Sequence, residues 1–360
     1  MIPRKIGLAL ALDGGTTNTR ARLVRDREIV ATCKRAVGVR NAVLDSARSP
    51  LASAVRESLE EAIQAGGGTQ PDLIVAAGML SAEVGLLGVP HVVAPVDSEQ
   101  LARGAAVRIL PEVSELPIVF VTGVRTPAEP GLDGWAAADV MRGEECETIG
   151  AWQLLNRGSK AEGSEQEAWK DQTTNSRNVF VWPGSHTKLV EVDGAGRILR
   201  SYSTLAGELT AALANHTLLA ASLDQGLPDS PDPEAARAGA RLVRNVGLGR
   251  AAYLVRVSAL QNQFNAHERA SFLVGALIAD DVDHLARHSM FRTASRVWVG
   301  GRQPQRSLYT AELRLRIESP VEELEAGIVD QASTFGALAV AARLPEDLWI
   351  AATSGSARAD

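Results

Sequence analysis

Residues 5–20, KIGLALALDGGTTNTR, join an apolar run to a turn built from small polar residues. The run at 5–12 has the length and composition of a buried strand, and the glycines after it let the chain reverse. Backbone N–H groups beside glycine can approach an anion closely, and short hydroxyl and amide side chains add donors. The stretch therefore predicts a strand, a phosphate-binding turn and a second strand, although an ordinary β-hairpin has similar residues.

Individual roles follow from the residue types in this turn. The phosphate-binding candidates are Gly14, Gly15, Thr16, Thr17, Asn18 and Arg20. Arg20 has the charge to neutralise a phosphoryl group during transfer. Asp13, at the end of the first strand, is placed to bind a hydrated Mg²⁺, which needs few carboxylates. The P-loop pattern, Gly-x4-Gly-Lys-Ser/Thr, is absent here.

Composition limits the class of protein. The chain has 360 residues, enough for two domains, and 45% of them are hydrophobic and 22% charged. This excludes a disordered or fibrous protein. The net charge of −6 argues against a nucleic-acid partner. Apolar runs at 3–12 and 73–96 are interpreted as sheet core, so no membrane segment is expected. With only Cys33 and Cys146, we expect no disulfide framework and a cytoplasmic location.

Short apolar and β-branched runs between Gly, Pro and Asp breakers predict an alternating α/β order. The expected strands are 5–12, 20–25, 28–33, 72–77, 117–122, 178–182, 187–192, 197–203 and 296–300, with 89–96 extended. The expected helices are 50–65, 98–109, 137–156, a long region over 208–290 interrupted at 227–233, and a final helix from about 331. The polar segment 158–177 is expected to be an exposed loop.

The same succession occurs twice along the chain. A glycine turn at 14–20 and another at 183–188 are each followed by a strand, a tight turn and a third strand. This repetition predicts two related domains facing each other across a ligand-binding cleft. We expect one domain to contain 1–138 with 331–360 and the other to contain 139–330.

The second turn and three further motifs supply additional candidates. The second phosphate loop would use Gly184, Ser185, Thr187 and Lys188, while His186 is interpreted as a hydrogen-bonded turn residue. Gly300 and Gly301 end a strand, and they allow either close approach of adenosine or simply a chain turn. Asp139, at an expected helix start, could be a general base or a helix cap. Arg142 could bind a substrate carboxylate or make a surface ion pair.

The order of these motifs resembles the actin, hexokinase and Hsp70 superfamily. More narrowly, the chain is similar to the 2-dehydro-3-deoxygalactonokinase family of sugar-acid kinases. The resemblance covers nearly the whole chain through LDGGTTNTR (12–20), ADVMRGEE (138–145), PGSHTK (183–188), LAGEL (205–209) with His216, and FLVGALI (272–278). It implies two actin-like, ribonuclease H-like domains with mixed sheets flanked by helices.

The resemblance also implies site roles. Asp139 would be the catalytic base, Asp13 would handle Mg²⁺, the two glycine turns would hold the phosphates of ATP, and Gly300 and Gly301 would lie near adenosine. Arg142, Glu144 and Ser81 are the substrate candidates.

The chain departs from the family pattern at three places. Gly14 stands where the family has tryptophan, the order Ser185-His186-Thr187 is reversed, and 78–85 lacks the family's Gln-Gly-Trp.

The implied reaction is ATP-dependent phosphorylation of 2-dehydro-3-deoxy-D-galactonate to its 6-phosphate, in galactonate catabolism. Two alternatives stay open: a kinase of a different sugar or sugar acid, and a non-catalytic actin-like nucleotide-binding regulator. The partners expected are the sugar acid and ATP, and a homodimer is compatible with the sequence, which does not determine the oligomeric state.

Overall fold

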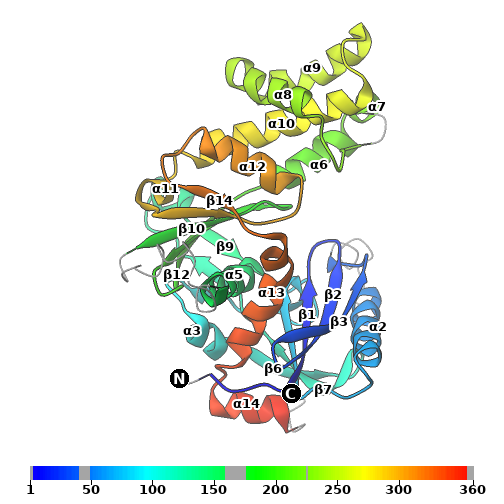
Figure 1. Ribbon diagram of the computed structural model, residues 1–360, viewed down its shortest axis with the longest axis vertical. Helices are drawn as coiled ribbons and strands as arrows, with labels where there is room; N and C mark the ends of the chain where they lie inside the picture. The colour runs from blue at the N-terminus through cyan, green and yellow to red at the C-terminus, as the bar shows by residue number, and fades with distance from the viewer. Residues whose placement is uncertain (1–2, 40–48, 159–175, 224–225, 355–360) are drawn as a thin grey trace. The chain divides into compact units, whose positions relative to one another are not determined.

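The computed structural model describes residues 3–39, 49–158, 176–223 and 226–354 (Figure 1). By contacts the chain divides into two compact units. Unit 1 comprises Met1–Thr174, Asp193–Ser201 and Ala326–Asp360, and unit 2 comprises Asn175–Val192 and Tyr202–Glu325. The predicted polar loop at 158–177 lies almost entirely outside the described residues. Within the described residues, no helix has the length and apolar character needed to cross a membrane.

Unit 1 is built on a six-stranded mixed sheet with the order β3-β2-β1-β4-β7-β6. The strands are β1 Leu8–Gly14, β2 Thr19–Arg25, β3 Glu28–Arg35, β4 Leu73–Gly78, β6 Ala106–Leu110 and β7 Ser114–Phe120. The pairs β1–β2 and β2–β3 are antiparallel, whereas β1–β4 and β4–β7 are parallel. The parallel strands therefore end at one edge of the sheet, where the first glycine turn also lies.

Alternation of side-chain size along β1 determines what covers each face of this sheet. Leu8, Leu10 and Leu12 are buried in one apolar cluster with residues of α2 (Ser49–Ala65). The alanines between these leucines point to the opposite face, because successive strand residues alternate. There α13 (Ala326–Ala341) packs against β1 and β4, and α5 (Glu144–Gly158) packs along α13. Small side chains on this face allow the close approach of both helices.

Glycines set the spacing between α5 and α13. A Cβ on Gly150 would lie 1.8 Å from the carbonyl oxygen of Ala332, and one on Gly336 would lie 1.8 Å from that of Cys146. Larger side chains would force the helices apart. The helix predicted over 137–156 thus belongs by contacts to unit 1, and the expected boundary after residue 138 is not where the contacts divide the chain.

The remaining elements of unit 1 are short. They are η1 Met79–Ser81, β5 Val92–Val93, α3 Ser98–Arg103, β8 Val124–Thr126, α4 Leu132–Ala136, β9 Asp139–Met141 and α14 Glu346–Thr353. The strands β5, β8 and β9 form a separate sheet. The helix expected over 98–109 is wrong beyond Arg103, because the β-branched residues after Gly104 pair with β7 as strand β6.

A second sheet repeats the strand order of the first. Its order is β12-β11-β10-β13-β14, from β10 Arg177–Trp182, β11 Thr187–Asp193, β12 Ile198–Thr204, β13 Arg296–Val299 and β14 Val321–Glu323. The pairs β10–β13 and β13–β14 are parallel. The strands β10, β11 and β12 are neighbours joined by short turns, which only antiparallel strands allow. Thus β10 to β14 repeat β1, β2, β3, β4 and β7, and the predicted pair of related α/β folds is confirmed.

Helices make up the rest of unit 2. They are α6 Ala206–His216, α7 Ala220–Leu223, α8 Pro233–Val246, α9 Leu248–Gln261, α10 Ala266–Leu285, α11 Ser289–Thr293 and α12 Gln305–Arg314. The long helix α10 serves two cores. Val274, Ile278 and Val282 pack with the sheet, whereas Phe272 and Leu273 pack with α6 to α9. The predicted helical region with a proline-rich interruption is confirmed.

Candidate functional site

The first glycine turn is a closed hairpin between β1 and β2. The Gly15 N–H donates to the Asn18 carbonyl oxygen at 2.8 Å, and the Asn18 amide donates to the Thr17 hydroxyl at 2.8 Å. Thr19 is buried and donates to the Val37 carbonyl oxygen at 2.7 Å. Gly15 and Thr17 are exposed at the turn. The hairpin therefore holds its shape through its own hydrogen bonds and presents Gly15 and Thr17 to solvent.

Two glycines, Gly78 and Gly143, bring neighbouring chain segments close to this hairpin. Gly78, at the end of β4, has φ +69, and a Cβ there would lie 2.6 Å from the Gly14 carbonyl oxygen and 3.3 Å from Asp13 Oδ1. Gly143 has φ +114, and its Cβ would lie 3.3 Å from Gly78 Cα. The fold thus gathers Asp13, the hairpin and the segment before α5 at one sheet edge, although the sequence places that segment in the other domain.

Side-chain packing explains why a glycine stands at position 14, where the family has tryptophan. A Cβ on Gly14 would lie 2.5 Å from Leu80 Cγ, so the leucine side chain occupies the space next to the glycine. Leu80 is fully buried and belongs to the altered segment 78–85. The two departures from the family pattern are therefore in contact, and a tryptophan at position 14 would not fit this arrangement.

Arg142 is held in a half-buried position by polar neighbours. Its guanidinium donates to Ser81 Oγ at 2.9 Å and to the Val89 carbonyl oxygen at 2.6 Å, and it lies 3.3 Å from His91 Nε2. Its backbone N–H donates to Glu144 Oε2 at 3.2 Å. Burial lowers the pKa of Arg142, and the nearby charges of Glu145 and Glu83 oppose that shift. The structure therefore brings together the three predicted substrate residues and adds His91, which the sequence did not indicate.

Two glutamates in the first turn of α5, the buried Glu145 and the partly buried Glu147, follow Arg142. Glu145 is 1% exposed and accepts hydrogen bonds from the Gly143 N–H at 2.9 and 2.7 Å. Burial, and then the charge of Glu144, raise its pKa to about 8. Burial also raises the pKa of Glu147, with the charges of Glu144 and Asp13 adding to the shift. Glu145 is therefore a buried carboxyl group, although charged side chains are almost never fully buried unless paired.

Asp139 lies on a strand rather than at a helix start. It begins β9, where it pairs with Thr126 of β8, and α5 begins only at Glu144. The helix-cap interpretation is excluded by this position. Its Oδ2 atom is buried and makes no hydrogen bond within the described residues. A buried oxygen without a donor is uncommon in proteins and marks a position that calls for a functional explanation.

Arg20 and Arg22 of β2 point to the helix α13. Arg20 Nη1 lies 3.6 Å from Asp330 Oδ1, and the buried Arg22 places Nη2 at 2.6 Å from the same oxygen. Arg22 also donates to Thr334 Oγ1 at 3.2 Å. Arg20, the predicted phosphate ligand, is thus ion-paired within unit 1. The carboxylate of Asp330 thus connects α13 to β2.

In unit 2 the turn Pro183–His186 is clamped by the start of α6. The Glu208 N–H donates to the Ser185 carbonyl oxygen at 2.8 Å. Glu208 Oε1 lies 3.3 Å from His186 Nε2. A Cβ on Gly207 would lie 1.9 Å from the Gly184 carbonyl oxygen, so only glycine permits this contact. The histidine is therefore a turn residue with a carboxylate partner, as the sequence predicts.

Thr187 and Lys188 are buried with partners inside unit 2. The Thr187 hydroxyl is 2.8 Å from the Tyr309 hydroxyl, which donates to Asp281 Oδ2 at 2.6 Å. Burial raises the pKa of Asp281, and the hydrogen bonds from Tyr309 and its neighbours oppose the rise. The Lys188 ammonium donates to Ser203 Oγ. Both predicted phosphate ligands thus have structural contacts that the sequence did not reveal.

Gly300 and Gly301 follow β13 and contact the same turn. A Cβ on Gly300 would lie 2.1 Å from the Trp182 ring, and Gly301, with φ +76, would place one 2.6 Å from the Pro183 carbonyl oxygen. The structure therefore joins the second hairpin, the two glycines and the start of α6. The arrangement parallels unit 1, where the positive-φ Gly78 contacts the first hairpin.

A family model identifies the family to which the chain belongs. The model of the 2-keto-3-deoxy-galactonokinase family matches residues 13–332. The chain belongs to this family. The prediction of a sugar-acid kinase is thereby confirmed, and the matched range runs through both hairpins, β9 and the Gly300–Gly301 pair.

One solved structure supports the fold. A Sinorhizobium meliloti protein assigned as a 2-dehydro-3-deoxygalactonokinase has a TM-score of 0.66 and 20% identity, over 92% of this chain and 98% of its own. A hexokinase from Thermus thermophilus has a TM-score of 0.39 and 15% identity, over 92% of this chain and 97% of its own. The archaeal actin homologue Ta0583 has a TM-score of 0.44 and 12% identity, over 93% of this chain and 99% of its own. No curated protein matches the chain.

Proposed function

We propose that this family member transfers the γ-phosphoryl group of ATP to the terminal hydroxyl of 2-dehydro-3-deoxy-D-galactonate, giving the 6-phosphate. The observation that carries the proposal is the family match over residues 13–332, which includes both hairpins of the repeated sheets. The reaction would belong to galactonate catabolism in the cytoplasm. The buried, free thiols of Cys33 and Cys146 fit a reducing compartment, and the net charge of −6 gives no reason to expect a nucleic-acid partner.

Both hairpins are proposed to bind the phosphates of ATP through their backbone N–H groups. Exposed Gly15 and Thr17 support this role in unit 1, and Gly184 and Ser185 are the corresponding residues in unit 2. Other residues are proposed to shape these turns or give them charge: Thr16, Asn18, Arg20, Thr187 and Lys188. Gly300 and Gly301 are proposed to lie near adenosine, because they end β13 beside the second hairpin.

Magnesium is the metal expected with ATP, and the donors of unit 1 fit it. No group of three acidic, histidine or cysteine side chains with metal-binding geometry occurs among the described residues. Mg²⁺ needs no such group, since it keeps several waters and takes one or two carboxylates plus substrate phosphates. Asp13 would supply that carboxylate at the end of β1. When bound, the ion would neutralise charge on the phosphates.

Asp139 is proposed as the general base that accepts the proton of the substrate hydroxyl. Its buried Oδ2, which has no hydrogen-bond donor among the described residues, supports this role, because a substrate hydroxyl would supply the missing donor. Arg142 is proposed to bind the substrate carboxylate, since a guanidinium can donate two parallel hydrogen bonds. Ser81 and Glu144 would hold Arg142 in place through the contacts given above.

The experiment is a kinase assay of the wild type, Asp139→Asn and the control Asp133→Asn, which changes an exposed aspartate of α4. Loss of a general base lowers turnover by about 10²–10⁴-fold. We expect a loss in this range for Asp139→Asn, near-normal turnover for the control, and unchanged ATP binding in both. Turnover of Asp139→Asn within threefold of the wild type would remove Asp139 from the mechanism.

A panel of acids then tests the substrate. ADP release is followed with 2-dehydro-3-deoxy-D-galactonate, its gluconate epimer, galactonate and gluconate. The proposal is supported if 2-dehydro-3-deoxy-D-galactonate stimulates ADP release most strongly. Strongest stimulation by another acid identifies a kinase with a different acceptor, and ATP binding without any stimulation identifies a regulator.

A further inference from the structure

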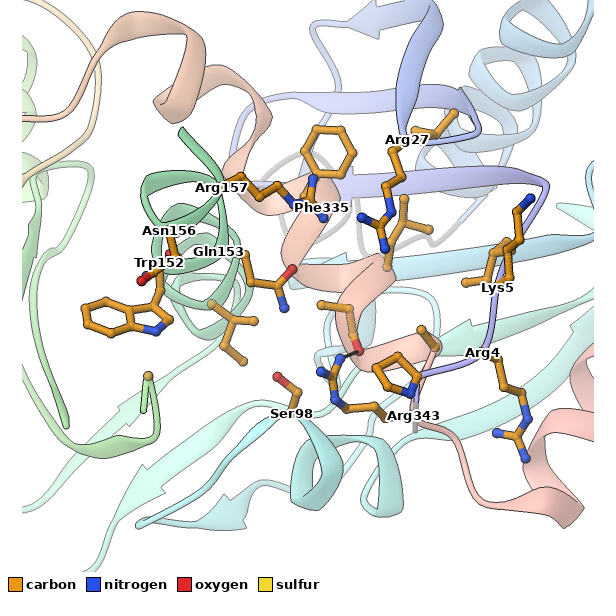
Figure 2. A pocket seen from close by; sticks show the side chains of 18 of the residues that line it. Arg4, Lys5, Arg27, Ser98, Trp152, Gln153, Asn156, Arg157, Phe335 and Arg343 are labelled. Carbon is orange, nitrogen blue, oxygen red and sulfur yellow. Dashed lines mark hydrogen bonds between the residues drawn. The ribbon is translucent and has the colours of Figure 1, made fainter. Parts of the chain in front are cut away.

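A cavity of about 1240 Å³ opens in unit 1 at the opposite end of β1 from Asp13. Its walls come from α5, α13, the segment before β1, and the turns that follow β2 and β11 (Figure 2). None of the residues placed in the kinase reaction above lines it. The cavity therefore needs an explanation separate from phosphoryl transfer.

The lining of this cavity is strongly basic. It contains five cationic side chains, Arg4, Lys5, Arg27, Arg157 and Arg343, and one carboxylate, Asp26. The whole chain, by contrast, has a net charge of −6. Such a local excess of cations produces a positive potential that attracts anions, and a concave wall strengthens it.

Two of the five cations have carboxylate partners. Arg4 pairs with Glu346 of α14 and lies over the Trp349 ring, and Lys5 Nζ lies 3.9 Å from Asp26 Oδ1. The other three form no ion pair with any residue in the described ranges. Among the described residues, the Arg343 guanidinium donates only to the carbonyl oxygen of Ala339 in α13, at 2.8 Å. Within the described ranges, three guanidinium groups of the cavity thus have no anionic partner.

The guanidinium groups of Arg27 and Arg157 lie near the aromatic ring of Phe335 in the cavity lining. Figure 2 shows the Arg27 and Arg157 side chains extending toward each other from opposite walls, with Phe335 behind them. The Arg157 guanidinium lies 5.4 Å from the centre of the Phe335 ring. Burial lowers the pKa of Arg157, and the charge of Arg27 adds to the decrease. A bound anion would relieve this repulsion.

The wall beside these arginines is formed by close packing. Gly196 has φ +80, and a Cβ there would lie 2.2 Å from Trp152 Cδ1, so the turn lies flat on the indole. Apolar side chains, including Leu338 and the 5% exposed Phe335, line the depth of the cavity. Ligands in such pockets combine apolar contact with a few polar contacts that fix orientation.

We propose that this cavity is a binding site for an organic phosphate that has a flat apolar ring. Arg27 and Arg157 bind the phosphate, because guanidinium groups match phosphate oxygens in geometry and charge. Arg343 adds a third donor, and the ring packs against Phe335 and Trp152. The site is independent of the kinase reaction and would remain if the proposed substrate were wrong.

The test is calorimetric titration of the full-length protein with 1-naphthyl phosphate, inorganic phosphate and 1-naphthol. The wild type is compared with Arg27→Glu/Arg157→Glu, with the milder Arg343→Gln, and with Arg56→Glu. Arg56 is an exposed arginine of α2 outside the cavity, so its charge reversal controls for net charge. Thermal unfolding of each variant shows whether it is folded.

We expect 1-naphthyl phosphate to bind at least tenfold more tightly than either fragment. We also expect Arg27→Glu/Arg157→Glu to weaken binding at least tenfold, Arg343→Gln to weaken it severalfold, and Arg56→Glu to leave it unchanged. A non-hydrolysable ATP analogue with Mg²⁺ should not displace the probe. No binding at millimolar probe, equal weakening in Arg56→Glu, or full displacement by the nucleotide would each overturn the proposal. If the double variant does not fold, Arg343→Gln decides.

Discussion

Replacing Glu145 with glutamine should remove part of the pH dependence of unfolding. The side chain is buried, and its pKa is raised from 4.5 to about 8. The native state therefore keeps a proton that the unfolded chain releases above pH 4.5. Stability decreases as pH rises from about 4.5 to 8, and the decrease stops above the folded pKa. Glutamine is neutral at every pH, so Glu145→Gln removes this contribution.

The magnitude follows from the size of the pKa shift. One pKa unit corresponds to about 1.4 kcal/mol, so the destabilisation reaches about 3 kcal/mol at pH 7 and about 5 kcal/mol above pH 8. Between pH 5.5 and 7.5, the free energy of unfolding of the variant relative to the wild type should rise by about 3 kcal/mol. Glu147 also has a raised pKa, but it is present in both proteins. Because the charge of Glu145 contributes to the raised pKa of Glu147, the difference between the curves reports Glu145 together with its coupling to Glu147.

The assay is urea unfolding at pH 5.5, 6.5 and 7.5, followed by tryptophan fluorescence and circular dichroism. Glu112→Gln is the matched control, because Glu112 is exposed in a turn. The control should differ from the wild type by a constant amount at all three pH values. A wild-type minus Glu145→Gln difference that stays flat with pH would refute the reasoning, since a buried proton is its only source.

Three further variants test other contacts. Arg142→Gln should raise KM for the sugar acid at least tenfold while changing KM for ATP little, as measured by steady-state kinetics, because its guanidinium is proposed to bind the substrate carboxylate. Gly301→Ala should destabilise by about 1–3 kcal/mol through its φ of +76, whereas Gly327→Ala, with open space around it, should not; thermal unfolding compares them. Tyr309→Phe should cost about 1–3 kcal/mol in urea unfolding, because a buried hydroxyl chain is interrupted, whereas the half-exposed Tyr253 should tolerate the same change.

The sequence predicts the strands well because their signal is local. Runs such as 8–12 and 178–182 are apolar and end in glycine or proline, so their identity does not depend on distant partners. The three-residue strand β9 has no such signal, since Asp139–Met141 is extended only because β8 lies beside it. Similarly, Arg108 and its neighbours form a strand because β7 offers an antiparallel edge.

The sequence predicts the side chains of the candidate site less well than the turns that contain them. The partner of Arg20 is Asp330, far along the chain, and the partner of Thr187 is Tyr309. Nothing near either residue in the sequence indicates such a pairing. Burial of Glu145 is equally hidden, because a glutamate at a helix start is ordinarily exposed. Motifs thus identify where chemistry can occur, whereas charge partners depend on the whole fold.

The repeated sheet explains why the glycines recur at equivalent places. In each unit the strand next to the hairpin-forming strand ends beside the hairpin, and the chain must then turn away without a side chain between them. Gly78 and Gly301 meet this need with φ +69 and +76, each 2.6 Å from a hairpin carbonyl oxygen when a Cβ is added. Conformation and space therefore both demand glycine. A pair of unrelated phosphate turns would not require matched glycines on matched strands, so the correspondence supports duplication of the entire unit.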